Sequence, residues 1–323
     1  MEMNITGVNA GVIRNNDEFL AVALKLNIKK SDTKLLFFPA LTLRDLFVAM
    51  EYHLSKQKEL DGTQRDDFIA AQTAVTKAMH AHIPELKREE LENADINYRV
   101  NAIDNFTYDE GKLIFTLQLH NNEKFTFEVH ELQIELLTHV LIHAINNAGM
   151  RDLALRISSL LDFLPLYDVD CQPDGKMIYD TYTQPEWKTA LFDHYLILLY
   201  HYAETKKKST FCGTVIKTRS LPDTPETQAI AKRLLAFSPR LGKLASKACQ
   251  VHIQAINVQE GEPLNLDRCM HTLNQIRHQV TVKPSVKKPK NNIAKTLPRY
   301  SVAALELPAP EQKVRRYYSK ALL

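Results

Sequence analysis

The sequence predicts an α+β fold in which groups of strands are each followed by a helix. Two observations lead to this prediction. Alternating apolar residues, which are typical of strands, give way to apolar residues at helical spacing. This order of three strands and one helix occurs twice, around residues 20–54 and 112–147. We therefore expect a duplicated first domain (1–149), a second α/β domain (150–279) and a C-terminal tail (280–323).

The first copy begins with a hairpin predicted over residues 3–28, whose turn is Arg14-Asn15-Asn16-Asp17. Within residues 19–28, large apolar residues alternate with alanine, lysine and asparagine, and this period of two predicts a strand with one face in the core. A third strand is expected at residues 34–38. Thr42 then begins a helix whose apolar residues recur at helical spacing.

Residues 55–97 are highly charged, and their apolar content is mostly alanine. Their spacing predicts a weakly amphipathic helix around Phe68–Met79 and a shorter helix at 84–93. We interpret the stretch as a helical insertion between the two copies, and a solvated hairpin is its simplest form.

The second copy has strands predicted at 98–103, 113–120 and 124–129, and a helix at 130–147. An offset of 93 places Leu24 on Leu117, and three fewer turn residues then give an offset of 90 through the helix. One consistent gap supports an internal repeat. Because one helix covers a three-stranded sheet incompletely, we expect the two copies to pack together as a pseudo-symmetric unit.

The second region is predicted to begin with a helix at 151–164 that ends at Pro165, followed by an acidic turn at 168–175 and a loop-rich stretch at 176–188. Residues 192–202 are apolar enough for a strand or a buried helix. The remaining expected elements are a strand at 210–217, a helix at 225–237 capped by Thr224, a strand at 250–258 and a helix at 266–278.

Positive charge is concentrated at the C-terminus. Residues 280–323 hold ten Lys/Arg against two acidic residues, a balance of +8, whereas the whole chain has a net charge of +3, so residues 1–279 carry −5. The tail is rich in proline and lysine, and we expect it to be mostly disordered and flexible. A basic tail on an acidic body is typical of an arm that contacts nucleic acid or an acidic protein partner.

The chain is predicted to be cytoplasmic. Its four cysteines, Cys171, Cys212, Cys249 and Cys269, lie in or beside apolar runs without metal-binding spacing, as buried thiols do in a reducing compartment. The N-terminus lacks the pattern of a signal peptide, and no apolar run approaches the roughly 18 residues of a membrane span. No membrane contact is therefore expected.

Catalytic and metal-binding motifs are not found by spacing, and we expect no cofactor. His139 and His143 fall four apart with Glu135 on the same helical stripe, which is a possible metal site, but the side of a helix that faces water is the simpler interpretation. The acidic stretch at 168–175 has Pro173 where a calcium loop needs glycine. An enzyme with a dispersed site is the weaker alternative, and a non-enzymatic protein is favoured.

The nucleic-acid hypothesis depends on cations around the second region and in the tail. Arg240, Lys243 and Lys247 are spaced three and four apart, so they would share one face of a helix and could form a phosphate track. Tyr195, Tyr200 and Phe211 lie nearby, and core packing explains them better than base stacking. The full candidate set is Lys206, Lys207, Lys208, Lys217, Arg219, Lys232, Arg233, Arg240, Lys243, Lys247, Lys287, Lys288, Lys290, Arg315 and Arg316.

Three segments carry a family resemblance: GVNAGVIR (7–14), INNAGMRDLALRISSLLDFLPLYDVDCQ (145–172) and YDTYTQPEW (179–187). In them the chain resembles an enterobacterial family of the YjeJ type. This resemblance implies a bacterial cytosolic protein and brings no activity or site residue with it. The tandem sheet-and-helix order is also similar to PUR and Whirly single-strand binders, whose repeats have four strands where three are counted here.

Two functions follow as expectations. The first is a non-enzymatic accessory protein that binds nucleic acid, such as a single strand, through its phosphate backbone without base specificity. The alternative is a protein-interaction subunit of a larger bacterial assembly that docks through its C-terminal tail.

Overall fold

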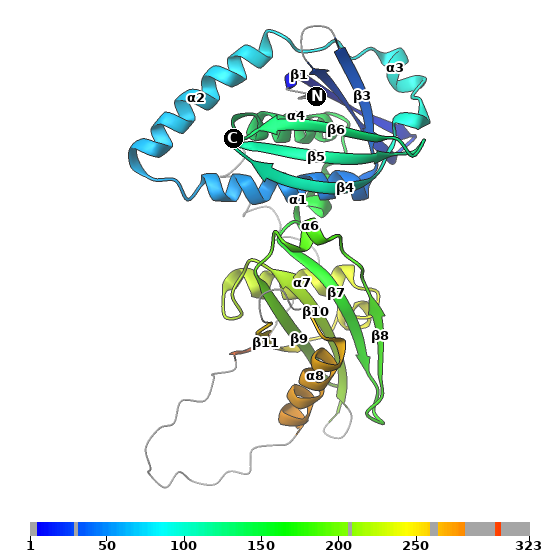
Figure 1. Ribbon diagram of the computed structural model, residues 1–323. Helices are drawn as coiled ribbons and strands as arrows, with labels where there is room; N and C mark the ends of the chain where they lie inside the picture. The colour runs from blue at the N-terminus through cyan, green and yellow to red at the C-terminus, as the bar shows by residue number, and fades with distance from the viewer. Residues whose placement is uncertain (1–4, 29–31, 206–208, 259–263, 282–300, 305–323) are drawn as a thin grey trace. The chain divides into compact units, whose positions relative to one another are not determined.

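The computed structural model describes residues 5–28, 32–205, 209–258, 264–281 and 301–304 (Figure 1). Its helices and antiparallel sheets confirm the α+β class. The chain divides into two compact units, Met1–Asp162 with Gln184–Leu191, and Phe163–Thr183 with Phe192–Leu323. The first unit thus continues past the predicted boundary at residue 149 and includes a short segment from beyond it.

The first unit contains the two predicted groups of three strands and a helix. Its elements are β1 (Ile5–Asn15), β2 (Glu18–Ile28), β3 (Asp32–Phe38), α1 (Ala40–Gln57), α2 (Gly62–His80), α3 (Arg88–Glu92), η2 (Ile96–Tyr98), β4 (Val100–Asp109), β5 (Lys112–Leu119), β6 (Lys124–His130), η3 (Glu131–Gln133), α4 (Ile134–Asn147), α5 (Arg151–Ser158) and α6 (Glu186–Thr189). The order β-β-β-α therefore occurs twice, while a common origin of the two groups stays a prediction.

The strands form two antiparallel sheets, β1-β2-β3 and β4-β5-β6. Asn16 and Gly111 have positive φ angles, 52° and 77°, in the tight turns that join the first two strands of each sheet. The alternation predicted from the sequence decides the inner faces, because Leu24 and Leu26 of β2 and Phe115 of β5 are fully buried.

Helices α1 and α4 complete this core. Helix α1 contacts strands of both sheets, namely β2, β3 and β4, whereas α4 contacts β1 and β2. The two helices also touch each other, since the Thr138 hydroxyl lies 3.7 Å from the Met50 sulfur. The arrangement buries the apolar stripe of each helix.

The insertion is helical, as predicted, but part of it packs against the sheet. Helix α2 is exposed, with Met79 its one buried residue, and Figure 1 shows it along the outside of the unit. After it, the chain crosses the outer face of β1-β2-β3, where the Asn9 side-chain amide donates to the Pro84 carbonyl oxygen at 2.9 Å and the Lys25 ammonium to the Glu85 carbonyl oxygen at 2.6 Å.

The second unit is built on one antiparallel sheet of six strands in the order β12-β11-β9-β10-β7-β8. Its elements are β7 (Phe163–Cys171), β8 (Met177–Thr181), β9 (His194–Ala203), β10 (Ser209–Thr218), α7 (Pro225–Phe237), η4 (Gly242–Leu244), β11 (Gln250–Ile256), α8 (Leu266–Thr281) and β12 (Ser301–Ala304). Thr224 caps α7 as predicted, because its hydroxyl oxygen accepts the Thr227 N–H.

Helices cover both faces of this sheet (Figure 1). Helix α8 packs Leu273 against Leu199 and Val215, and at Gly213 a Cβ atom would lie 2.6 Å from a Leu273 methyl carbon. On the other face, Tyr200 is fully buried and donates its hydroxyl to the Ala231 carbonyl oxygen of α7 at 2.7 Å. Tyr200 is therefore a core residue and not a platform for base stacking.

Two predicted elements of the second region are wrong. Residues 163–171 form the strand β7, where a helix end and an acidic turn were expected, and residues 177–181 form β8, where a loop was expected. Pro165 is tolerated in a strand because the pairing of β7 with β10 is irregular next to it, between Val215 and Ile216.

The predicted tail lies almost entirely outside the described residues. The described part of it is residues 280 and 281, which end helix α8, and residues 301–304, which form β12 and pair antiparallel with Gln250–Ile253 of β11. Helix α8 extends to Thr281, three residues beyond the predicted end. Among the described helices, none has both the length and the apolar character needed to cross a membrane.

Candidate functional site

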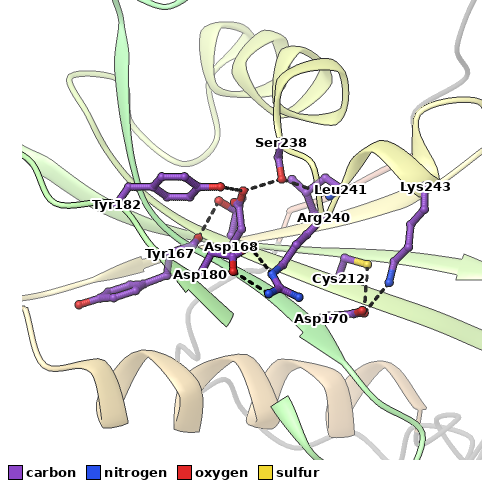
Figure 2. A network of polar contacts seen from close by, with 11 residues as sticks. Tyr167, Asp168, Asp170, Asp180, Tyr182, Cys212, Ser238, Arg240, Leu241 and Lys243 are labelled. Atoms are coloured by element: carbon purple, nitrogen blue, oxygen red, sulfur yellow. Dashed lines mark hydrogen bonds and ion pairs between the residues drawn. The ribbon is translucent and has the colours of Figure 1, made fainter. Parts of the chain in front are cut away.

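The segment between α7 and β11, which carries the predicted phosphate track, is not a regular helix. It contains only the short 3-10 turn η4, so Arg240, Lys243 and Lys247 do not share the helical face that their spacing predicted. Their positions are decided by partners on the sheet. Figure 2 shows this network of polar contacts in the second unit.

Arg240 and Lys243 each form an ion pair with an aspartate. The Arg240 guanidinium donates to both carboxylate oxygens of Asp180 on β8, at 2.5 and 2.6 Å. The Lys243 ammonium lies 2.5 Å from Asp170 Oδ1 on β7. Bidentate pairing fixes the guanidinium plane as well as its position. The hydrogen bond from Arg240 lowers the pKa of Asp180, so this carboxylate is ionised at neutral pH.

Asp168 occupies the buried centre of the network, with 1% of its surface exposed. Its Oδ2 atom accepts the hydroxyl of Ser238 at 2.5 Å and that of Tyr182 at 2.8 Å. Ser238 in turn accepts the backbone N–H of Leu241 at 3.1 Å. Burial and the contact with Asp168 raise the pKa of Tyr182, so the phenol remains a hydrogen-bond donor.

This geometry holds the chain in place and does not activate a nucleophile. Ser238 donates directly to a carboxylate, whereas an attacking serine needs a base that takes its proton and an orienting group behind that base. Within the described residues, no partner reaches the second carboxylate oxygen of Asp168. The network therefore fastens the segment after α7 to β7 and β8.

The cysteines are buried, unpaired thiols, as predicted. Desolvation raises the pKa of Cys212 to about 12 and the pKa of Cys171 to about 11, and it also raises that of Cys249. Burial likewise raises the pKa of Cys269 to about 11. Because the thiolate is the reactive form, none of these side chains is prepared for nucleophilic chemistry at neutral pH.

Four further candidate cations lie over aromatic rings. Lys217 lies 4.8 Å from the ring centroid of Tyr195, and Lys247 lies 4.8 Å from that of Tyr202. Arg219 covers Phe192 at 5.1 Å. Arg233 covers Phe163 at 5.8 Å, and both phenylalanine rings are buried. These contacts place cationic groups on the rim of the core, where aromatic faces attract them.

The other candidate residues are either exposed or outside the described residues. Lys232 lies on an exposed position of α7. Outside the described residues lie Lys206, Lys207, Lys208, Lys287, Lys288, Lys290, Arg315 and Arg316. The structure thus places Arg240 and Lys243 beside acidic partners. It does not bring all of the candidate nucleic-acid-binding cations together on one surface of the described residues.

His139 and His143 are exposed on α4. A ring nitrogen of His143 lies 2.8 Å from the side-chain amide of Asn147. In the part of the chain that the structure describes, no three histidine, cysteine or acidic side chains are arranged to hold a metal ion. Among the described residues, His139 and His143 therefore have no third side chain with which to bind a metal ion.

The residues that sequence reasoning missed are the acidic and hydroxyl partners of the network. The alternation of Asp168 and Asp170 in a segment with apolar neighbours could have predicted a strand with one polar face. Ser238 follows α7 directly, at a position where small polar residues often satisfy free backbone groups, and that signal was also available.

Comparison with known proteins gives one clear likeness. A family model described as "YjeJ-like" matches residues 1–283. A protein of Escherichia coli (strain K12) called "Uncharacterized protein YjeJ" is 48% identical over 284 residues, which cover 88% of this chain and 98% of that protein. No solved structure matches the chain. The resemblance to PUR and Whirly proteins therefore stays a prediction.

Proposed function

The chain belongs to the YjeJ-like family, and we propose that it is a non-enzymatic interaction subunit that binds an extended segment of a protein partner at strand β8. One observation supports this proposal most directly. Strand β8 ends the six-stranded sheet and, among the described residues, pairs with β7 alone. An edge strand with a free backbone side is a template for a further strand.

The register defines which backbone groups are free for such pairing. Gln172 donates its N–H to the Lys176 carbonyl oxygen, and Tyr182 donates to that of Leu166. Even-numbered residues of β8 therefore bond to β7, because hydrogen-bonded pairs alternate along an antiparallel ladder. By the same alternation, Tyr179 directs its N–H and C=O groups away from β7.

The side chains at this edge support docking of a protein segment. Ile178 is 41% exposed and Tyr179 is 44% exposed, on neighbouring positions that face opposite sides of the sheet. A strand added alongside would cover apolar surface on both faces. The ion pair between Arg240 and Asp180 holds β8 in place beforehand, so less chain entropy is lost on binding.

The same ion pairs weaken the case for a phosphate track. A phosphate that approached Arg240 or Lys243 would have to displace Asp180 or Asp170, so fewer counterions would be released than the charge count suggests. The docking site proposed here differs from the one expected from the sequence, because β8 (Met177–Thr181) lies in the body of the second unit and the expected site is the tail at 280–323.

A peptide selection on the purified full-length protein tests the proposal. A displayed library of short random peptides should yield binders with alternating apolar side chains. Tyr179→Pro removes the outward N–H, and we expect it to weaken these binders about tenfold, the value of roughly one hydrogen bond. Tyr179→Ala keeps the N–H and should weaken them less. Equal affinity for the wild type and Tyr179→Pro, with both folded by circular dichroism, would reject the edge as the site.

Backbone-directed nucleic-acid binding is the second candidate, and the +8 balance of residues 280–323 favours it. If this function holds, affinity for a single-stranded oligonucleotide should fall steeply as salt rises, and removal of residues 280–323 should lower both the affinity and the salt slope. Absence of binding at low salt would exclude it.

A cytoplasmic location is also part of the proposal. It is supported by four buried thiols that remain unpaired.

A further inference from the structure

The first unit contains a pocket of ≈ 590 Å³ whose wall is rich in aromatic rings. Tyr52 and His53 come from α1, Phe68 from α2 and Tyr108 from β4. The His53 ring packs against Tyr108 with centroids 4.5 Å apart, and nearly perpendicular to the Tyr52 ring with centroids 5.1 Å apart. Aromatic faces attract cations through the negative potential above the ring.

His53 is the second observation at this site. Its side chain is buried, with 8% of the residue exposed, and among the described residues nothing forms a hydrogen bond with Nε2. A buried polar atom without a partner is costly, so it points to a group supplied from outside the chain. Burial lowers the pKa of His53 to about 4, so the ring is neutral at physiological pH and can accept a hydrogen bond.

Glu131 supplies negative charge to the same pocket. Its Oε2 atom accepts the Tyr108 hydroxyl at 2.8 Å, which orients both side chains. The hydrogen bond to Glu131 raises the pKa of Tyr108, so this phenol stays a donor. A carboxylate beside aromatic faces and a neutral imidazole favours a guest that carries positive charge and N–H donors.

We propose that this pocket binds a guanidinium group of the kind found in the arginine side chain. A guanidinium is planar and weakly hydrated, so it can stack on the exposed Tyr108 ring while its N–H groups bond to Glu131 and His53. The inference concerns the first unit and is independent of the β8 edge.

Two other kinds of ligand fit this pocket less well. An anion would meet the Glu131 carboxylate, and the Lys56 ammonium, which also lines the pocket, lies 3.5 Å from the Glu59 carboxylate and 6.0 Å from the Tyr52 ring centroid. A metal ion would find one imidazole and one carboxylate here, and the described residues form no larger ligand group.

Calorimetric titration of the full-length protein tests the proposal with three probes. Agmatine represents a free small guanidinium, a capped arginine tripeptide represents a protein side chain, and the matching citrulline tripeptide keeps the shape but not the charge. We expect the guanidinium probes to bind and the citrulline peptide to bind at least about tenfold more weakly. Binding of agmatine alone identifies a small metabolite as the guest, and binding of the peptide alone identifies a protein.

Variants locate the site. Glu131→Gln keeps an acceptor for Tyr108 but removes the charge, and His53→Phe keeps a ring but removes Nε2. Each should weaken the guanidinium probes about tenfold, while Tyr98→Leu, an exposed aromatic residue that does not line the pocket, should not change them. Thermal unfolding checks that the variants are folded. No binding of either guanidinium probe at millimolar concentration, or equal binding of the citrulline peptide, would overturn the proposal.

Discussion

The two sheets of the first unit have similar inner faces and different outer faces. On β1-β2-β3 the outer residues Ala21, Ala23 and Phe37 are buried, and Leu91 from α3 packs over them. On β4-β5-β6 the outer residues of the central strand are Ile114, Thr116 and Gln118, which keep part of their surface exposed. The first sheet is therefore covered on both of its faces, whereas the outer face of the second sheet stays partly exposed.

The outer positions of a strand, more than the inner ones, indicate what packs against it. Both central strands carry large apolar residues on the inner face, so that face does not distinguish them. The outer face does, because small apolar residues allow a second layer to approach closely, whereas threonine and glutamine are compatible with water. The predicted alignment, with its offset of 93, pairs Ala23 with Thr116 and so supplies matched positions for experiment.

The largest effect is expected from a charge placed at those two positions. Ala23→Glu puts a carboxylate at a site with 0% exposure among apolar neighbours, and we expect it to lower the free energy of unfolding by about 3–5 kcal/mol. Thr116→Glu places the same group at a partly exposed site, where the change should stay within about 0.5–1 kcal/mol. Urea denaturation of both variants provides the measurement, and equal losses would show that the two outer faces are equivalent.

The next effect concerns how closely the insertion approaches the sheet. A Cβ atom at Gly7 would lie 1.8 Å from the His82 carbonyl oxygen, which also accepts the Asn27 side-chain amide at 2.8 Å. Gly7→Ala must push this backbone away, and we expect a loss of about 1–3 kcal/mol in the free energy of unfolding.

Gly11→Ala is the control for that variant. Its nearest contacts are methyl carbons of Leu86 and Leu91 at 3.0 and 3.2 Å, and side chains can adjust more easily than backbone. The loss should be smaller than for Gly7→Ala in the same thermal and urea measurements. A larger loss at Gly11 would place the closest approach elsewhere on β1.

Much of the first unit could be predicted because its signals are local. The alternation in β2 and β5 and the helical spacing in α1 each lie within one element. The strand β7 was missed because the apolar spacing of the preceding helix continues to Leu161 and because Pro165 suggested an end to regular structure. The irregular pairing beside Pro165 depends on β10, which is distant in the sequence.

The candidate site was less predictable, since its partners are far apart along the chain. Arg240 pairs with Asp180 across 60 positions, and Lys243 with Asp170 across 73. The spacing of the cations is visible in the sequence, but the carboxylates that neutralise them are brought close only by the sheet. The Nε2 atom of His53, which has no hydrogen-bond partner among the described residues, likewise depends on packing and leaves no sequence motif.

The smallest effect is expected from the ion pair that anchors the insertion. Lys25 on β2 lies 2.6 Å from the Glu90 carboxylate, and its hydrogen bond lowers the pKa of Glu90. A carboxyl whose pKa is lower in the folded state adds stability above its unfolded pKa, and that stability is lost as the pH falls through the folded value. Glu90→Gln should therefore cost about 1 kcal/mol at pH 7 and progressively less below about pH 4.

The control for this pair lies on β4-β5-β6, the sheet whose outer face is partly exposed. Lys124 and Asp104 form an ion pair at 2.9 Å in which the lysine side chain is 66% exposed. Because solvent screens such a pair, Asp104→Asn should change the free energy of unfolding by less than about 0.5 kcal/mol at pH 7. If Glu90→Gln proves equally neutral at pH 7, the Glu90 carboxylate does not hold the insertion on the sheet, and the contact depends on the apolar packing at Leu91 and on the hydrogen bonds to backbone carbonyl oxygens of the insertion, such as that from Lys25 to Glu85.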